Sequence, residues 1–142
     1  MKRTKKVVLP SLETQTLAFV AEARATDERV FARCLAWAGF RAYLRVWRDY
    51  DAAGEVLPEV LIIAQIEVPE RFRGRGWFWQ YCDLCAMLGF DALVIESVVN
   101  KRLRASLRAR ADCAEFEEHN FLWRRGREGR TEAPVGREAG AG

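Results

Sequence analysis

The spacing of hydrophobic residues predicts two amphipathic helices near the start of the chain. A segment at residues 5–9, apolar from residue 7 to residue 9, precedes them, and we expect it to form a short strand. The hydrophobic positions are Leu12, Thr16, Phe19 and Ala23 in the first helix, and Val30, Phe31, Cys34, Leu35 and Ala38 in the second. Asp27 begins the second helix and Gly39 ends it, because glycine commonly follows the last helical turn. The sequence therefore predicts a helix pair ahead of the sheet.

The next part of the chain has the spacing of two strands. Residues 40–50 alternate between apolar and polar positions, and residues 51–54 have the composition of a turn. Extended spacing resumes at residues 57–68, whose centre at residues 61–64 is continuously apolar. A continuous apolar run is typical of a strand covered on both faces, so we expect this strand to be central in the sheet.

A strand–helix–strand succession follows. Residues 76–88 have a wide apolar helical stripe, and residues 91–99 are mostly apolar and β-branched. Such a unit predicts a parallel crossover connection, so the sheet is expected to be mixed within an α/β fold. Residues 100–111 predict a basic helix and residues 115–123 a final strand. The segment 126–142 lacks periodicity, and we expect it to be a disordered tail after a single domain at residues 1–125.

Composition narrows the class of protein. A chain of 142 residues that is 50% hydrophobic can bury one core. No apolar run approaches the roughly 20 residues that a membrane-spanning helix needs, and the lysine-rich start lacks the apolar segment of a secretory signal. We therefore expect a soluble, cytoplasmic protein without membrane partners.

The cysteines do not predict a metal site. Cys82 and Cys85 form a single Cys-x-x-Cys pair within a helical pattern, and His119 is the one histidine. A closed zinc site needs four ligands in recognisable spacing, so we interpret these cysteines as buried helical thiols and expect no metal.

The most informative motif joins the central strand to the following helix. The motif is Arg71-Phe72-Arg73-Gly74-Arg75-Gly76. Glycines let a ligand approach the backbone closely, the N–H groups at a helix start favour an anion, and arginines suit phosphate. The spacing matches neither the Gly-x-x-x-x-Gly-Lys-Ser/Thr phosphate loop nor the Gly-x-Gly-x-x-Gly dinucleotide motif. We therefore expect an anion-binding loop of another kind.

This loop resembles the acetyl-CoA loop of the GCN5-related N-acetyltransferases, which follows the pattern (Gln/Arg)-x-x-Gly-x-(Gly/Ala). Arg71, Gly74 and Gly76 match the pattern, and the resemblance extends over residues 40–123 and is closest to compact bacteriophage members. It implies a mixed, mostly antiparallel sheet with a central, splayed parallel strand pair and helices on both faces. It also implies that acetyl-CoA is the cofactor. The implied cofactor-binding residues are Ile66, Val68, Arg71, Phe72, Arg73, Gly74, Arg75, Gly76, Asn100 and Leu103.

Direct acyl transfer to an amine needs a base or a water route to bulk solvent, since the attacking amine must be neutral. Glu67 is the first candidate, with an ion-pair partner as its alternative role, and Glu96 is the second, with a structural carboxylate as its alternative. The family commonly places a tyrosine where this chain has Leu107. Either Ser106, Tyr81 or water would then protonate the leaving thiolate, or the thiolate would leave without a dedicated acid.

Three function hypotheses follow. The first is an acetyl-CoA-dependent N-acyltransferase acting on an unidentified amine. The second is a binding protein of the same fold without the chemistry, which docks on a host protein or nucleic acid through the basic residues 101–110. In the third, the acceptor is itself a nucleic acid base. Trp79 is the residue of the 77–79 aromatic cluster that we expect to stack on a ligand, while core packing is expected for Trp77 and Phe78. His119 is either a further base or a surface residue.

Overall fold

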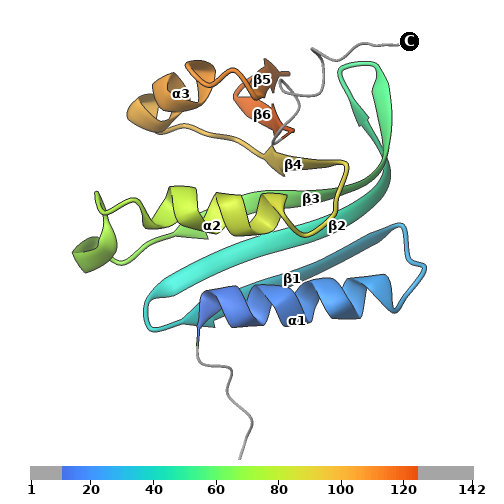
Figure 1. Cartoon of the computed structure of the whole chain (residues 1–142), viewed down its shortest axis with the longest axis horizontal. Helices are drawn as coiled ribbons and strands as arrows, with labels where there is room; N and C mark the ends of the chain where they lie inside the picture. The colour runs from blue at the N-terminus through green and yellow to red at the C-terminus, as the bar shows by residue number, and fades with distance from the viewer. Residues whose placement is uncertain (1–10, 125–142) are drawn as a thin grey trace, which may run out of the picture.

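The computed structural model describes residues 11–124, which form one six-stranded mixed sheet and three α-helices (Figure 1). The expected strand at residues 5–9 and the expected tail at residues 126–142 lie outside the described residues. The elements are α1 (Leu12–Arg24), β1 (Val30–Trp37), β2 (Phe40–Ala52), β3 (Glu55–Glu67), a 3₁₀ turn η1 (Glu70–Phe72), α2 (Trp77–Ala86), β4 (Ala92–Ile95), α3 (Lys101–Arg108), β5 (Cys113–Phe116) and β6 (Asn120–Trp123). None of the described helices is both long and apolar enough to cross a membrane.

The sheet order is β1-β2-β3-β4-β6-β5. All neighbouring strands are antiparallel except β3 and β4, which are parallel and register Val60 with Ala92 and Ile63 with Ile95. The predicted mixed sheet, the central position of residues 61–64 and the parallel crossover through α2 are confirmed.

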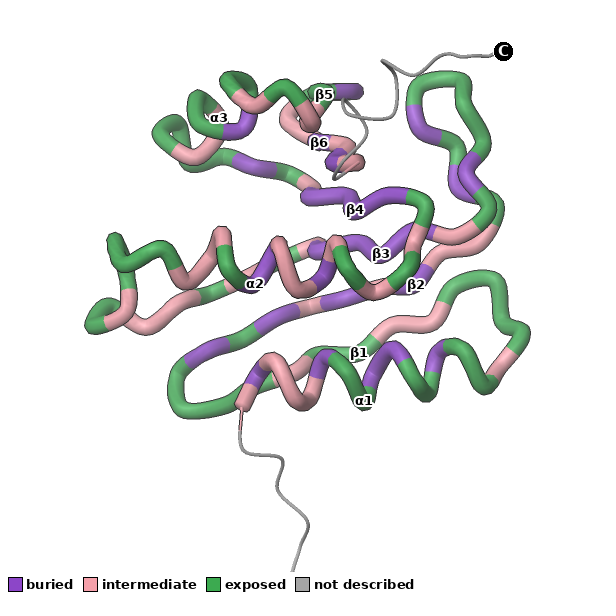
Figure 2. The backbone as a smooth tube through the Cα atoms, viewed as in Figure 1, coloured by how far each residue is buried: buried purple, intermediate pink, exposed green. Residues whose placement is uncertain are grey.

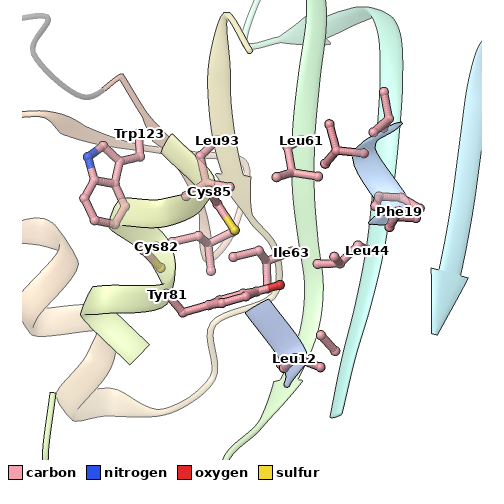
Figure 3. Close-up of a cluster of buried hydrophobic side chains, with 14 of the residues drawn as sticks. Leu12, Phe19, Leu44, Leu61, Ile63, Tyr81, Cys82, Cys85, Leu93 and Trp123 are labelled. Carbon is pink, nitrogen blue, oxygen red and sulfur yellow. The ribbon is translucent and has the colours of Figure 1, made fainter. Parts of the chain in front are cut away.

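All three helices contribute to one buried cluster on one face of the sheet. Strand residues alternate between faces, so Leu61 and Ile63 point into this cluster while Val60 and Ile62 belong to a second one. Tyr81, Cys82 and Cys85 of α2 belong to this cluster, and Tyr81 and Cys85 point toward the strands in Figure 3. The second cluster contains no helical residue; it is closed by Tyr50, Leu57 and Phe116. The expectation of helices on both faces is therefore wrong for residues 11–124.

The predicted helix at residues 27–38 is also wrong, because residues 30–37 form the edge strand β1. Phe31 lies on the face that packs against α1, with its ring 5.6 Å from that of Phe19. The opposite face carries Ala32 and Cys34, so apolar residues occur on both faces of the strand. Taken together in the sequence, the apolar residues of the two faces have the three- and four-residue spacing of a helix. One helix, α1, precedes the sheet.

The predicted final strand at residues 115–123 is two short strands joined by a tight turn. Glu117 and His119 adopt positive φ angles of 49° and 70° in that turn. Neither is glycine, and the turn lacks the residues that usually mark one in a sequence. The tube in Figure 2 shows the buried positions concentrated on β2, β3 and β4 rather than on this terminal hairpin.

Candidate functional site

The parallel strands β3 and β4 separate beyond Ile63 and Ile95. The last hydrogen bond between them runs from the Glu96 N–H to the Ile63 carbonyl at 3.0 Å. The next N–H group, on Ser97, donates instead to the Asn120 side-chain oxygen at 2.8 Å. Ser97 has a φ of 54°, which turns the chain toward β6. The chain after β4 is therefore bonded to the terminal hairpin and leaves β3.

The other side of the gap is held by β2. Residues Gln65 and Ile66 stay paired with Tyr43 and Ala42, and the register shifts so that Ala64 is an extra residue in β3. An extra residue increases local twist and bends its strand. The end of β3 thus follows β2 while the end of β4 follows β6, and the parallel pair is splayed.

Two connected cavities occupy this gap. The inner cavity, of about 240 Å³, lies between the diverging strand ends. The outer cavity, of about 530 Å³, extends toward the loop at residues 73–76. The two share four lining residues: Ile66, Phe78, Asn100 and Leu103. A ligand that reaches the strands from the loop would pass these four side chains.

The loop enters α2 through two glycines in left-handed conformation. Gly74 has a φ of 76° and Gly76, the N-cap of α2, a φ of 81°. A Cβ at either position would meet no atom within 4 Å, so glycine is required by backbone conformation and the space beside it is open. Gly76 supplies no side-chain cap and the first turn of α2 carries no acidic residue. The first turn of α2 itself therefore supplies no carboxylate at the positive end of the helix dipole, which lies at the outer cavity.

The loop is supported from below by the β1–β2 turn. A Cβ added to Gly39, whose φ is 91°, would lie 3.1 Å from Pro69, which shows how closely the turn approaches the start of the loop. Phe72 packs on Phe40 with ring centroids 5.2 Å apart. Arg73 donates from Nε to the Val68 carbonyl at 2.7 Å and so ties the loop back onto the strand end.

The start of α2 is positioned by α1. Trp77 Nε1 donates to Glu13 at 3.0 Å, and the Trp77 ring stacks on Tyr81 at 4.9 Å. The Tyr81 hydroxyl lies 2.7 Å from the Thr16 hydroxyl. Burial is the main cause that raises the pKa of Tyr81 above its ordinary value. Tyr81 lines neither cavity, so it supports α2 from the core.

Most of the residues expected to bind a cofactor line the cavities. They are Ile66, Val68, Phe72, Arg73, Gly74, Gly76, Asn100 and Leu103. Asn100 also caps α3, because its side-chain oxygen accepts from the Leu103 N–H at 2.9 Å. Arg71 and Arg75 line neither cavity; Arg71 donates to the Ala38 carbonyl at 3.4 Å. The sequence predicted the same cofactor-binding role for these two arginines as for Arg73. Which way each side chain points depends on the conformation of the loop, and the sequence pattern does not specify it.

The three candidate catalytic residues lie in different places. Ser106 lines the outer cavity, and Glu96 lines the inner one with its carboxylate 3.0 Å from Arg45. Glu67 lines neither; it is half exposed and 3.9 Å from Arg41. Leu107, in contrast to its neighbour Ser106, is fully buried in the core. Leu107 therefore supplies no group to either cavity.

Three arginines of the basic residues 101–110 contact other side chains of the protein. Arg108 makes a two-point contact with Glu115, with distances of 2.6 and 3.0 Å. Arg110 makes a similar contact with Asp112, and Arg104 lies 3.0 Å from the His119 ring. His119 sits in the β5–β6 turn rather than in either cavity. Of the basic residues on α3, Arg102 is the one that lines a cavity.

The described cysteines are free thiols, of which Cys34 is exposed and Cys113 is partly buried. Cys82 and Cys85 are buried, and burial raises the pKa of the Cys85 thiol to about 12. Among residues 11–124, no group of three or more histidine, cysteine, aspartate or glutamate side chains is arranged to hold a metal ion. The interpretation of the Cys-x-x-Cys pair as buried helical thiols is confirmed.

Sequence reasoning missed several lining residues. Trp77, Phe78 and Arg102 line the outer cavity, together with Trp79, for which ligand contact was expected. Ile63, Ala64, Gln65, Ile95, Ser97, Val98 and Val99 line the inner one. Trp79 packs edge-on against Trp123 at 6.0 Å, so part of the aromatic cluster faces the cavity while it also packs on the fold. The inner cavity could have been predicted from the parallel strand pair. Residues 63–66 and residues 95–98 come at corresponding places where the two strands end, so they are expected to lie side by side.

Comparison with known proteins adds no relative. No family model matches the sequence, and neither the curated proteins nor the solved structures give a match.

Proposed function

We propose that the chain is an acyl-CoA-dependent N-acyltransferase of the GCN5-related type, with acetyl-CoA as the starting cofactor. The observation that carries this proposal is the splayed β3–β4 pair, whose gap continues as a cavity to a glycine loop at the start of α2. A CoA ester combines an anionic, phosphate-rich end with a long neutral arm. The outer cavity is lined by arginines and glycines at its loop end and by apolar side chains toward the strands, which is the order of the two parts of a CoA ester.

The charged end of CoA would lie at the loop. Arg73 comes from the loop and Arg102 from α3, and both line the outer cavity. Arg73 uses Nε for the Val68 carbonyl, and its two terminal guanidinium nitrogens carry further N–H donors. The glycine backbone and the uncapped start of α2 add N–H donors. Together these groups suit a pyrophosphate.

The thioester would lie between the strand ends. There the Val68 N–H would polarise the carbonyl as an oxyanion donor, by analogy with the family, and Pro69 has no N–H to continue the ladder. The acceptor nitrogen would attack the thioester carbon, the C–S bond would break, and the thiolate would take a proton. Ser106 is our candidate for that proton transfer because it lines the outer cavity. Glu96 is our candidate base, because it lines the inner cavity while Glu67 lines neither.

Calorimetry with CoA and acetyl-CoA tests the cofactor. We expect binding by the wild type, and a loss of affinity of about fivefold in Arg102→Ala, since an exposed charge pair contributes about 1 kcal/mol or less. Lys101→Ala is the matched control: Lys101 is also exposed on α3 but lines neither cavity. Absence of CoA binding at millimolar ligand would overturn the proposal, and equal losses in both variants would remove the assignment of Arg102.

Turnover is tested separately. Acetyl-CoA is incubated with pooled primary amines, peptides and oligonucleotides, and released thiol is measured. Binding of CoA without thiol release would favour the alternative of a fold that retains its cofactor site as a binding protein. The alternative is motivated by Leu107, which is buried in the core and stands where the family commonly has a tyrosine.

A further inference from the structure

The inner cavity is larger and more apolar than an acetyl group requires. It measures about 240 Å³, whereas an apolar cavity of about 150 Å³ already holds a benzene molecule. An acetyl group adds a single methyl beyond its carbonyl carbon. The difference in size leaves room beyond the thioester.

The position of this room follows from the shared lining residues. Phe78 and Leu103 line both cavities and so mark where the outer cavity becomes the inner one. A thioester that lies at this junction has its CoA arm on the loop side. Its acyl group then projects toward the residues that line the inner cavity alone. Ile63 and Ile95, the last paired residues of the parallel strands, lie at the closed end.

The lining suits a hydrocarbon chain. Most of its side chains are apolar: Ile63, Ala64, Ile66, Phe78, Ile95, Val98, Val99 and Leu103. Glu96 is the one ionisable side chain among them, and its charge is matched by Arg45 at 3.0 Å. Ser97 and Val99 are exposed, so the cavity has a mouth near them through which an acceptor can enter. An apolar wall with a single, already paired charge favours alkyl groups over polar acyl groups.

We propose that the acyl donor carries a straight chain longer than acetyl, in the range of butyryl to hexanoyl. This inference rests on the proposed CoA site. It names the acyl class, which a CoA loop alone does not determine. The chain would occupy the inner cavity beside Ala64, the extra residue of the β3 bulge.

A binding series with CoA, acetyl-CoA, butyryl-CoA and hexanoyl-CoA on the wild-type chain tests the proposal. Full burial of each added methylene raises affinity by about fourfold. We expect hexanoyl-CoA to bind at least tenfold more tightly than acetyl-CoA, because the mouth leaves part of the chain exposed. Binding of CoA and acetyl-CoA with no gain along the series would overturn the acyl inference and leave the CoA site standing. No binding of any member would overturn both.

A variant pair locates the effect. Ala64→Leu fills the inner cavity and is expected to reduce the preference for hexanoyl-CoA over acetyl-CoA to less than threefold, with CoA affinity retained. Ala105→Leu is the matched control, because Ala105 is exposed on α3 and lines neither cavity. Thermal melting of both variants checks that they fold. If Ala64→Leu melts early, Val99→Asp takes its place, since Val99 is 74% exposed and a charge at the mouth opposes the alkyl chain. An unchanged chain-length preference in a folded variant would place the acyl chain elsewhere and overturn the proposal.

Discussion

The Val98 N–H donates to the carbonyl oxygen of His119 at 2.8 Å, and this bond holds the chain beyond β4 against the β5–β6 turn. Val98 is only 5% exposed, so the bond is shielded from water. The inner cavity exists because this segment is bonded to the terminal hairpin rather than to β3. The terminal hairpin, which contributes no residue to either cavity, therefore determines the width of the gap.

Asn120 is expected to be a positioning residue for the gap. Its side-chain oxygen accepts from the Ser97 N–H at 2.8 Å. Asn120→Ala removes this acceptor and is expected to lower the free energy of unfolding by about 1 kcal/mol and to weaken CoA binding. Glu117→Ala, which removes the second contact of the Asn120 side chain and leaves its bond to Ser97, serves as the control. Equal CoA affinity in the wild type and Asn120→Ala would show that the Val98–His119 hydrogen bond holds the gap open without the Ser97–Asn120 bond.

The neighbouring leucines of α3 are expected to respond differently to truncation. Leu107 is fully buried, so Leu107→Ala should lower the free energy of unfolding by about 3 kcal/mol. Leu103 is half-buried and lines both cavities, so Leu103→Ala should cost about 1 kcal/mol and mainly weaken CoA binding. Urea unfolding and calorimetry measure the two effects. A larger stability loss in Leu103→Ala would contradict the assigned packing.

The Arg108–Glu115 pair predicts an acid-dependent contribution to stability. The hydrogen bond from Arg108 lowers the pKa of Glu115 from 4.5 to about 2. Because the folded-state pKa is depressed, the stabilisation is full above the unfolded value of 4.5 and is lost as the pH falls toward about 2. The difference in melting temperature between the wild type and Glu115→Gln should therefore shrink over this interval. A difference that stays constant would contradict the pair.

Thiol accessibility gives a test of the core. Cys34 is exposed, whereas Cys82 and Cys85 are buried and burial raises the pKa of both thiols. Since the thiolate is the reactive form, iodoacetamide at about pH 8 should modify Cys34 first. Cys82 and Cys85 should react after unfolding in urea, as mass spectrometry of the peptides would show. Early modification of Cys85 would contradict the packing of α2.

The central elements were predictable because their signals are local and strong. The run at residues 61–64 is apolar on both faces of β3, and the stripe from Trp77 to Cys85 corresponds to the side of α2 that packs on the sheet. The loop at residues 71–76 was found from its glycines, both of which adopt positive φ. The proposed CoA site stays a prediction, but most of its residues do lie together.

The errors arose where sequence periodicity is ambiguous. In β1, Arg33 lies on the same face as Phe31, with its guanidinium 4.3 Å from that ring, so a charged residue interrupts the apolar alternation. In β4 the predicted strand extends to residue 99, but it ends at Ile95 because Ser97 bonds to Asn120. No local pattern encodes a partner that lies 23 residues away.

The contact between Gly39 and Pro69 has a thermodynamic consequence for whatever binds above it. The β1–β2 turn, the ring of Phe40 and the Val68 carbonyl hold the loop through contacts within the protein. A preorganised loop loses little conformational entropy on association, so more of the contact energy is retained as affinity. A larger residue at Gly39 would push against Pro69 and loosen the loop. Binding would then cost more conformational entropy, although Gly39 itself lines neither cavity.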